Sequence, residues 1–270
     1  MYHKTLSNLY LELRSKMYSS ERIYQVRDLT KINLQGDFAL IIAVDSDGGI
    51  GPLQGDTIYC PAYQLGRFAI RVPLLEILSA GATPVAAFDM LTTKMEGVGA
   101  EIIAGIRDEL KDAGLPETFP LSGSTEDNVP TIMTGIGTVI IGLVKQQDFR
   151  PGSSQPSDLI LCIGKPKSAP EDTVRQDDSE IVHHKDVINL LKIDGVHDIL
   201  PVGSHGVAFE ANQLAQTAGL TFYSATNVAI NLTKSGGPST CVLVSCHEKA
   251  FEEIKQKIRV PTFLLGKLSE

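Results

Sequence analysis

The stretch Gly66–Ala87, GRFAIRVPLLEILSAGATPVAA, predicts a helix that ends at a glycine and is followed at once by a strand. Apolar residues recur at helical spacing over residues 64–81, which indicates a helix with one buried face. Gly81 suits the left-handed backbone position that commonly ends a helix. Pro84–Leu91, PVAAFDML, is then predicted as a strand.

Strands and helices mix on both sides of this stretch. Phe38–Val44, FALIIAV, is predicted as a strand buried on both faces. A second helix is expected over Gly97–Ala113 and a long apolar strand over Thr131–Val144. The mixture of both element types in both halves of the chain indicates an α/β or α+β fold.

The segment Asp148–Ser157, DFRPGSSQPS, is rich in glycine, proline and serine and is predicted as a linker. We therefore expect two domains, over residues 1–150 and 151–270.

His183 and His184 are expected on the surface of a polar helix. The elements expected in the second domain are strands at 158–164, 198–202, 228–232, 241–245 and 262–268, and helices at 179–191, 207–218 and 248–258.

The composition argues against several kinds of partner. The net charge of −8 over 270 residues does not favour a surface for nucleic acid. No segment reaches the roughly 18 consecutive apolar residues of a membrane helix, and Met1–Arg14 lacks the apolar core of a signal peptide. The four cysteines form no C-x-x-C pair, so no disulfide framework or zinc site is expected. These features predict a cytoplasmic protein.

A carboxylate pair follows the first apolar strand, in the sequence Asp45-Ser-Asp47-Gly48-Gly49. Alternate residues at a strand end lie on one side, about 7 Å apart. Mg²⁺ prefers such oxygen ligands and bridges to phosphate oxygens. Gly48 and Gly49 would let a ligand approach the backbone closely. Asp and Gly are also ordinary turn residues, so a polar turn without a ligand is the alternative.

Three charged residues of the predicted helix are candidates for the same chemistry. Arg67 and Arg71 are four residues apart and share a face, where guanidinium groups could hold phosphate oxygens. An exposed cationic face is the alternative. Glu76 stands within the apolar stretch LLEILSAGA, and burying a carboxylate there is costly unless it is paired or binds a cation. An ordinary exposed position is the alternative for Glu76.

Two polar loops are further candidates. In the segment GSTEDN, the side chains of Ser124, Thr125, Glu126 and Asp127 suit a site for a metal-bound nucleotide, although ordinary polar loops share this composition. In GSHG, a glycine-flanked turn before a helix can hold an anion, and His205 could contact a phosphate or transfer a proton. A plain turn with a solvent-facing histidine is the alternative there.

The order of these segments resembles a superfamily of ATP-using enzymes. The segments are LLEILSAGATPVAA, SGSTEDN, MTGIGTVIIG and SDLILCIGKP. They resemble aminoimidazole ribonucleotide (AIR) synthetase, thiamine-monophosphate kinase, selenophosphate synthetase and the carbamoyl-dehydrating hydrogenase maturation factor. The resemblance covers about residues 30–270. DSDGGIGP, GSTEDNVPT, PVGSHG and SGGPST are most similar to the α-ribazole kinase branch, which phosphorylates α-ribazole with ATP during salvage of the cobamide (cobalamin) lower ligand.

The resemblance implies a two-domain AIR-synthase-like fold. An N-terminal α/β domain would pair its sheet with its twin across a homodimer, and a C-terminal α+β domain would cover an ATP site. By position, Asp45, Asp47 and Glu76 would hold Mg²⁺. Ser124 replaces the acidic residue of the family's G-G-D-T, so Glu126 or Asp127 would have to take the role of that acid. His205 stands where many members have Asp.

The expected activity is transfer of phosphate from ATP to a small nucleoside-like alcohol, with Asp127 or His205 orienting the acceptor hydroxyl. The phosphates would be bound by Gly48 and Gly49, by Arg67 or Arg71, and by residues 124–126. Two alternatives are ATP-dependent activation of an amide or acyl oxygen, and nucleotide sensing without turnover. The replaced acids at positions 124 and 205 favour the sensor and argue against the amide chemistry.

Overall fold

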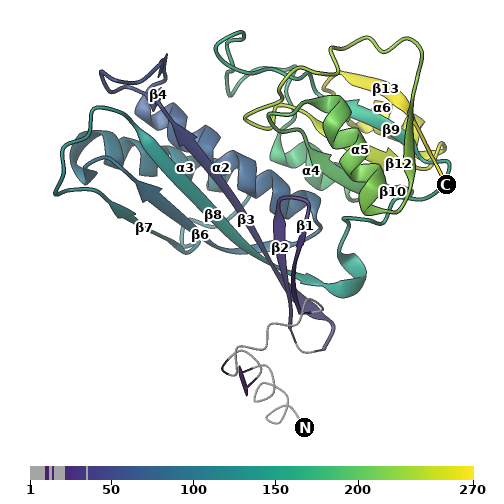
Figure 1. The fold of residues 1–270 in the computed structure, drawn as a ribbon, viewed down its shortest axis with the longest axis horizontal. Coiled ribbons are helices and arrows are strands. Elements are labelled where there is room, and N and C mark those ends of the chain that lie inside the picture. The colour runs from purple at the N-terminus through teal and green to yellow at the C-terminus, as the bar shows by residue number, and fades with distance from the viewer. Residues whose placement is uncertain (1–9, 12–13, 15–21, 35) are drawn as a thin grey trace.

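The computed structural model describes residues 10–11, 14, 22–34 and 36–270, whose fold is built on two sheets (Figure 1). The first sheet has six strands in the order β1-β2-β3-β8-β6-β7. Its strands are β1 (Ile23–Val26), β2 (Leu29–Asn33), β3 (Phe38–Gly48), β6 (Thr83–Leu91), β7 (Leu121–Thr125) and β8 (Gly135–Lys145). A short parallel pair, β4 (Ile50–Gly51) and β5 (Ile58–Tyr59), follows β3.

Two helices, α2 (Ala62–Ser79) and α3 (Ala100–Asp112), pack on one face of this sheet. They cross where each presents a glycine. A Cβ on Gly66 would lie 2.0 Å from the Ile102 carbonyl oxygen, and one on Gly105 would lie 2.0 Å from that of Tyr63. Larger residues would force the helices apart, so these glycines set their close contact.

The second sheet has five strands in the order β10-β12-β9-β13-β11. Helices cover both of its faces: α4 and α6 share an apolar core on one side, and α5 packs on the other. The elements are β9 (Leu159–Ile163), α4 (His184–Leu190), β10 (Val196–Pro201), α5 (Val207–Thr217), β11 (Thr221–Ser224), β12 (Val242–Cys246), α6 (Ala250–Lys257) and β13 (Thr262–Ser269).

Helix α2 contacts both sheets. Most of its buried face packs on the first sheet, but Leu75 belongs to the core of the second, together with Leu161 and Ile163. Arg71, which is fully buried, donates to the carbonyl oxygens of Val182, Pro238 and Ser239. The helix is therefore shared between the N-terminal and C-terminal halves.

The mixed α/β character and most predicted elements are confirmed, with several corrections. The predicted strand Phe38–Val44 continues to Gly48 and is buried on one face only. Residues 228–232 form no strand, and β11 lies at Thr221–Ser224 instead. Strands β1, β2, β4 and β7 were not predicted. His184 is buried beside Glu109, so the prediction of a surface position was wrong. In the described part of the chain, no helix combines the length and apolarity needed to cross a membrane.

Candidate functional site

Asp45 and Asp47 lie within β3 rather than in a bend after it. They continue the row of Ala39, Ile41 and Ala43, which faces the helices, and both are half-buried. Their side chains therefore share one face of the strand, as the alternate spacing predicts. Burial raises the pKa of Asp45 to about 6, and the negative charge of Asp47 contributes to the increase.

Glu76 projects from α2 into the same region. Burial is the main cause of its pKa of about 8; the charge of Asp28 raises the pKa further and Arg27 opposes the shift. The charges of Glu210 and Asp45 add smaller increases. These contributions place the carboxylates from β3, α2 and α5 in one region of the structure.

Asp28 and Glu210 are the site residues that the sequence prediction missed. Asp28 lies in the two-residue turn between β1 and β2, and its negative charge raises the pKa of Asp45, Glu76 and Glu210. Strand β2 pairs Thr30 with Ile42, so extending this register places Asp28 beside the segment of β3 that carries Asp45. The Arg-Asp dipeptide is not one of the glycine-containing pairs that signal a tight hairpin, so no local signal in the sequence pointed to Asp28.

We call these residues the acid cluster: Asp28, Asp45, Asp47, Glu76 and Glu210. Burial raises the pKa of Glu210 to about 7, again with a contribution from Asp28. The backbone of Gly203 lies against the Glu210 carboxylate and opposes the increase. The GSHG turn therefore borders the acid cluster.

The chemistry of the acid cluster fits a hard divalent cation. All of its ligands would be carboxylate oxygens, and their raised pKa values reflect burial and mutual repulsion that a cation would relieve. Among the described residues, no three His, Cys, Asp or Glu side chains form a ready-made metal site. Mg²⁺ commonly takes only one or two carboxylates and completes its shell with water and phosphate oxygens.

We expect thermal stability without divalent cations to fall as pH rises from 4.5, the ordinary glutamate value, towards about 8. The folded protein keeps protons on Asp45, Glu210 and Glu76 up to about pH 6, 7 and 8, whereas the unfolded chain releases them earlier. Stability present at low pH is therefore lost through this window. Melting curves in EDTA measure it. Glu76→Gln should flatten the upper part of the profile, and MgCl₂ should restore stability most at high pH. A Glu76→Gln profile parallel to the unmodified one would contradict the assignment.

The structure corrects the roles predicted for the two arginines. Arg67 binds Glu109, with 2.8 Å between Nε and Oε2, and also pairs with Asp112. Arg71 has no exposed surface and binds backbone carbonyls of the C-terminal half. Both do share a helix face, but α3 and the C-terminal loops occupy that face. Neither guanidinium is free for a phosphate in this structure.

The GSTEDN segment lies apart from the acid cluster. Ser124 and Thr125 belong to β7, which is three strands from β3, or about 14 Å at the usual strand spacing. Asp127 accepts from the Thr125 hydroxyl and the Met95 amide, and Glu126 accepts from two following amides. Both carboxylates are exposed and their pKa values are lowered, mainly by these hydrogen bonds. Their predicted nucleotide role stays a prediction.

The remaining candidates differ in how accessible they are. Gly48 has open space where a side chain would be, whereas Gly49, at φ +71°, bonds to the Thr134 carbonyl and packs near Met133. Of these two glycines, only Gly48 leaves room for a ligand against the backbone. His205 is exposed, and its ring lies 4.6 Å from that of Phe209. Its predicted role in orienting an acceptor is untested.

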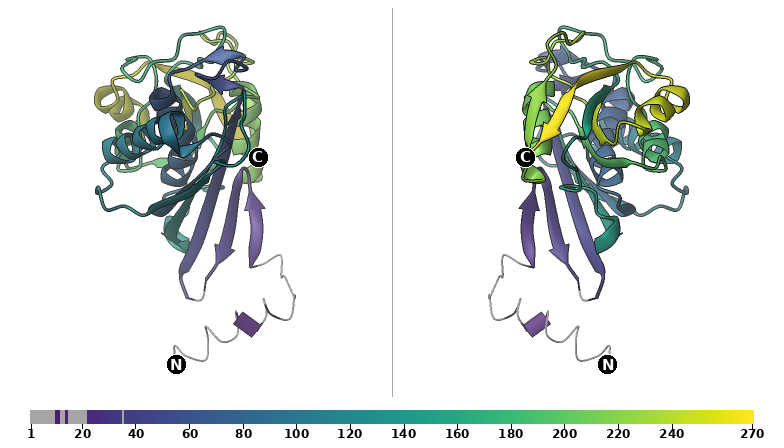
Figure 2. Two further views of the ribbon diagram at one scale, coloured as in Figure 1. Left: turned by 90° about the vertical axis from the view of Figure 1, so that its left-hand side faces the viewer. Right: turned by 90° about the vertical axis from the view of Figure 1, so that its right-hand side faces the viewer.

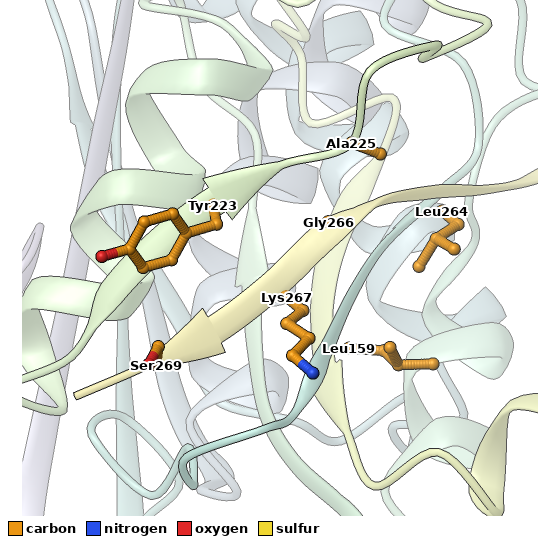
Figure 3. A pocket seen from close by; sticks show the side chains of 7 residues that line it. All are labelled: Leu159, Tyr223, Ala225, Leu264, Gly266, Lys267 and Ser269. Atoms are coloured by element: carbon orange, nitrogen blue, oxygen red, sulfur yellow. The ribbon is translucent and has the colours of Figure 1, made fainter.

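A separate depression of about 380 Å³ lies on the second sheet, and none of the predicted site residues lines it (Figure 3). Its lining includes Leu159, Tyr223, Leu264 and Lys267, from β9, β11 and β13. It is open and apolar, with no acidic residue, so it does not share the chemistry of the acid cluster.

The N-terminal part of the sequence matches a known protein family. Residues 31–144 match the protein family described as AIR synthase related protein, N-terminal domain. This range contains β3, α2 and β6, and hence Asp45, Asp47 and Glu76. The chain therefore has an AIR synthase-like N-terminal region. A comparison of the sequence with curated proteins gave no match.

Solved structures extend the likeness to the whole fold. AaThiL complexed with AMPPCP and TMP has a TM-score of 0.65 at 12% identity, over 100% of this chain and 92% of that one. Thiamine monophosphate kinase from Aquifex aeolicus has a TM-score of 0.63 at 14% identity, over 99% and 95%. Hydrogenase maturation protein HypE has a TM-score of 0.64 at 15% identity, over 93% and 87%. The resemblance is confirmed for the AIR synthase-like fold.

Proposed function

We propose that this protein is an ATP- and Mg²⁺-dependent kinase that phosphorylates a small nucleoside-like alcohol. The observation that carries the proposal is the acid cluster, in which the half-buried Asp45 and Asp47 share one face of β3 and the carboxylates of α2 and α5 lie near enough to affect one another's pKa. The fold supports it, because it is shared with a thiamine monophosphate kinase and with a structure containing AMPPCP.

The acid cluster would act mainly by positioning and by balancing charge. Bound Mg²⁺ would neutralise the phosphate oxygens and align the transferred group. Asp45 and Asp47 on β3, Glu76 on α2 and Asp28 in the β1–β2 turn are the residues that would hold the cation, one or two of them directly and the others through its water ligands. Phosphoryl transfer requires little covalent chemistry from the protein, so His205 or Asp127 is needed only to orient the acceptor hydroxyl.

We propose α-ribazole as the acceptor to test first, since the segments DSDGGIGP, GSTEDNVPT, PVGSHG and SGGPST are most similar to that kinase branch. The experiment is incubation with ATP, MgCl₂ and α-ribazole, with phosphorylated product followed by mass spectrometry. Product above the level of an Asp45→Asn variant supports the substrate. ADP release that depends on an amide substrate would point instead to acyl activation, and a thermal shift with ATP but no ADP to a sensor. A cytoplasmic location is part of the proposal.

We also propose that the enzyme is a homodimer formed through the first sheet. The face opposite α2 and α3 is apolar, and no described helix covers it (Figures 1 and 2). The register aligns Val44 with Val139 and Phe88, and Ile42 with Ile141. Contiguous exposed apolar surface of this kind commonly marks a protein interface.

We expect Val139→Lys to convert the dimer to monomers, because a lysine in the middle of this apolar face would have to be desolvated without a partner. Sedimentation velocity measures the change directly. Gln216→Lys adds the same charge at an exposed position of α5 and should leave the dimer intact. A Val139→Lys protein that sediments like the unmodified protein would remove this face from consideration.

A further inference from the structure

The turn between β1 and β2 is bound to the C-terminal half by one side chain. Arg27 donates to both carboxylate oxygens of Asp198, at 3.1 and 2.5 Å, and its Nε donates to the Thr217 hydroxyl at 3.0 Å. Asp198 lies on β10 and Thr217 on α5. Figure 2 shows the β1–β2 hairpin reaching up to the C-terminal elements from below.

The geometry of this contact is that of a fixed anchor. The Arg27 side chain is 5% exposed and that of Asp198 is fully buried. Asp198 also accepts from the amide of Gly152, which lies in the glycine- and proline-rich segment 148–157. Two-point guanidinium–carboxylate pairs restrict orientation as well as distance. Burial distinguishes this pair from the equally two-pointed but exposed pair of Arg175 with Asp177.

The backbone at Arg27 is held in an unusual conformation. Its φ is +55°, a left-handed value that a residue other than glycine rarely adopts. Such a conformation persists where surrounding contacts hold it. The ion pair with Asp198 supplies those contacts, and the residue that follows in the turn is Asp28.

We propose that Arg27 is a positioning residue that docks the β1–β2 turn onto the C-terminal half and thereby holds Asp28 in the acid cluster. The inference rests on the proposed function, because it assumes that the acid cluster binds a divalent cation. Asp28 is exposed, and the register that pairs Thr30 with Ile42 places it beside the segment of β3 that carries Asp45. The same docking brings together the parts of the cluster that come from the two halves, because α5 carries both Glu210 and Thr217.

The test is binding of Mn²⁺ alone to the full chain, measured by electron paramagnetic resonance. Arg27→Met should weaken binding about 10- to 100-fold, as loss of a group that orients a metal ligand commonly does. Asp28→Asn should weaken it by a similar factor. The Arg27→Met/Asp28→Asn protein should bind no more weakly than Asp28→Asn, because both changes remove the same ligand. A general structural effect of Arg27 would instead multiply with the loss of Asp28.

Two further variants keep the test informative if Arg27→Met fails to fold. The pair Arg27→Met/Asp198→Leu leaves no unpaired buried carboxylate and should fold while still binding Mn²⁺ weakly. Arg27→Gly/Asp198→Leu also relaxes the left-handed backbone at position 27, and should likewise fold and bind Mn²⁺ weakly. Folded variants that bind Mn²⁺ like the unmodified protein would overturn the role of Arg27 and leave the proposed metal site unaffected. Failure of the unmodified protein to bind Mn²⁺ would overturn the metal site and the inference together.

Discussion

Replacing Asp45 by asparagine is expected to lower the rate of ATP-dependent phosphorylation about 10²- to 10³-fold, the usual loss when one preorganised charge-stabilising group is removed. Asparagine keeps the size of the side chain but removes the negative charge that would hold Mg²⁺ against the phosphates. Asp45 is half-buried on the strand face that also carries Asp47. The measurement is the initial rate of ADP formation at saturating ATP and increasing MgCl₂.

The matched control for this prediction is Asp37→Asn. Asp37 is an exposed aspartate just before the other end of β3, about 26 Å from Asp45 along the strand. Asp37→Asn should leave the rate of ADP formation unchanged. Excess MgCl₂ should restore only part of the rate of Asp45→Asn. A rate for Asp45→Asn that equals the unmodified rate, with both proteins folded, would rule out a cation at this position.

Replacing Glu109 by alanine is expected to destabilise the fold by about 3–5 kcal/mol, the usual cost of removing one partner from a buried ion pair. The Glu109 side chain is 2% exposed and lies 3.7 Å from the fully buried Arg71 guanidinium. It also accepts from Arg67 and from Gln176. Without Glu109, the charge of Arg71 would stay buried without the carboxylate that pairs with it.

Urea unfolding curves of the purified variant measure this loss. Asp112→Ala is the control, because Asp112 also pairs with Arg67 but its side chain is 61% exposed. An exposed pair of this kind contributes only about 0–1 kcal/mol. Equal midpoints for Glu109→Ala and Asp112→Ala would show that burial of the network does not govern stability.

Sequence reasoning located the helix α2 and the strands β3 and β6 because their signals are local. Apolar spacing and Gly81 define the helix within one segment, and alternate spacing places Asp45 and Asp47 on one side of a strand whatever the fold around it. The extent of β3 was underestimated because Asp and Gly are typical turn residues, and here they continue a paired strand.

What could not be predicted depends on contacts between distant segments. The spacing of Arg67 and Arg71 shows that they share a helix face, but not that residues 182, 238 and 239 cover it. Asp28 and Glu210 are separated by 182 residues in sequence, and only the docked hairpin relates them. Strands β1 and β2, of four and five residues, are too short for a clear periodic signal.

The shared position of α2 has a practical consequence for dissecting this protein. A fragment ending near residue 150 would retain Leu75 and Arg71 but lose the partners that bury them in the C-terminal half. The complementary fragment would lack the leucine that completes its own apolar interior. Truncation at the glycine- and proline-rich segment should therefore yield insoluble pieces, and co-expression of both fragments is the form in which they would be recovered.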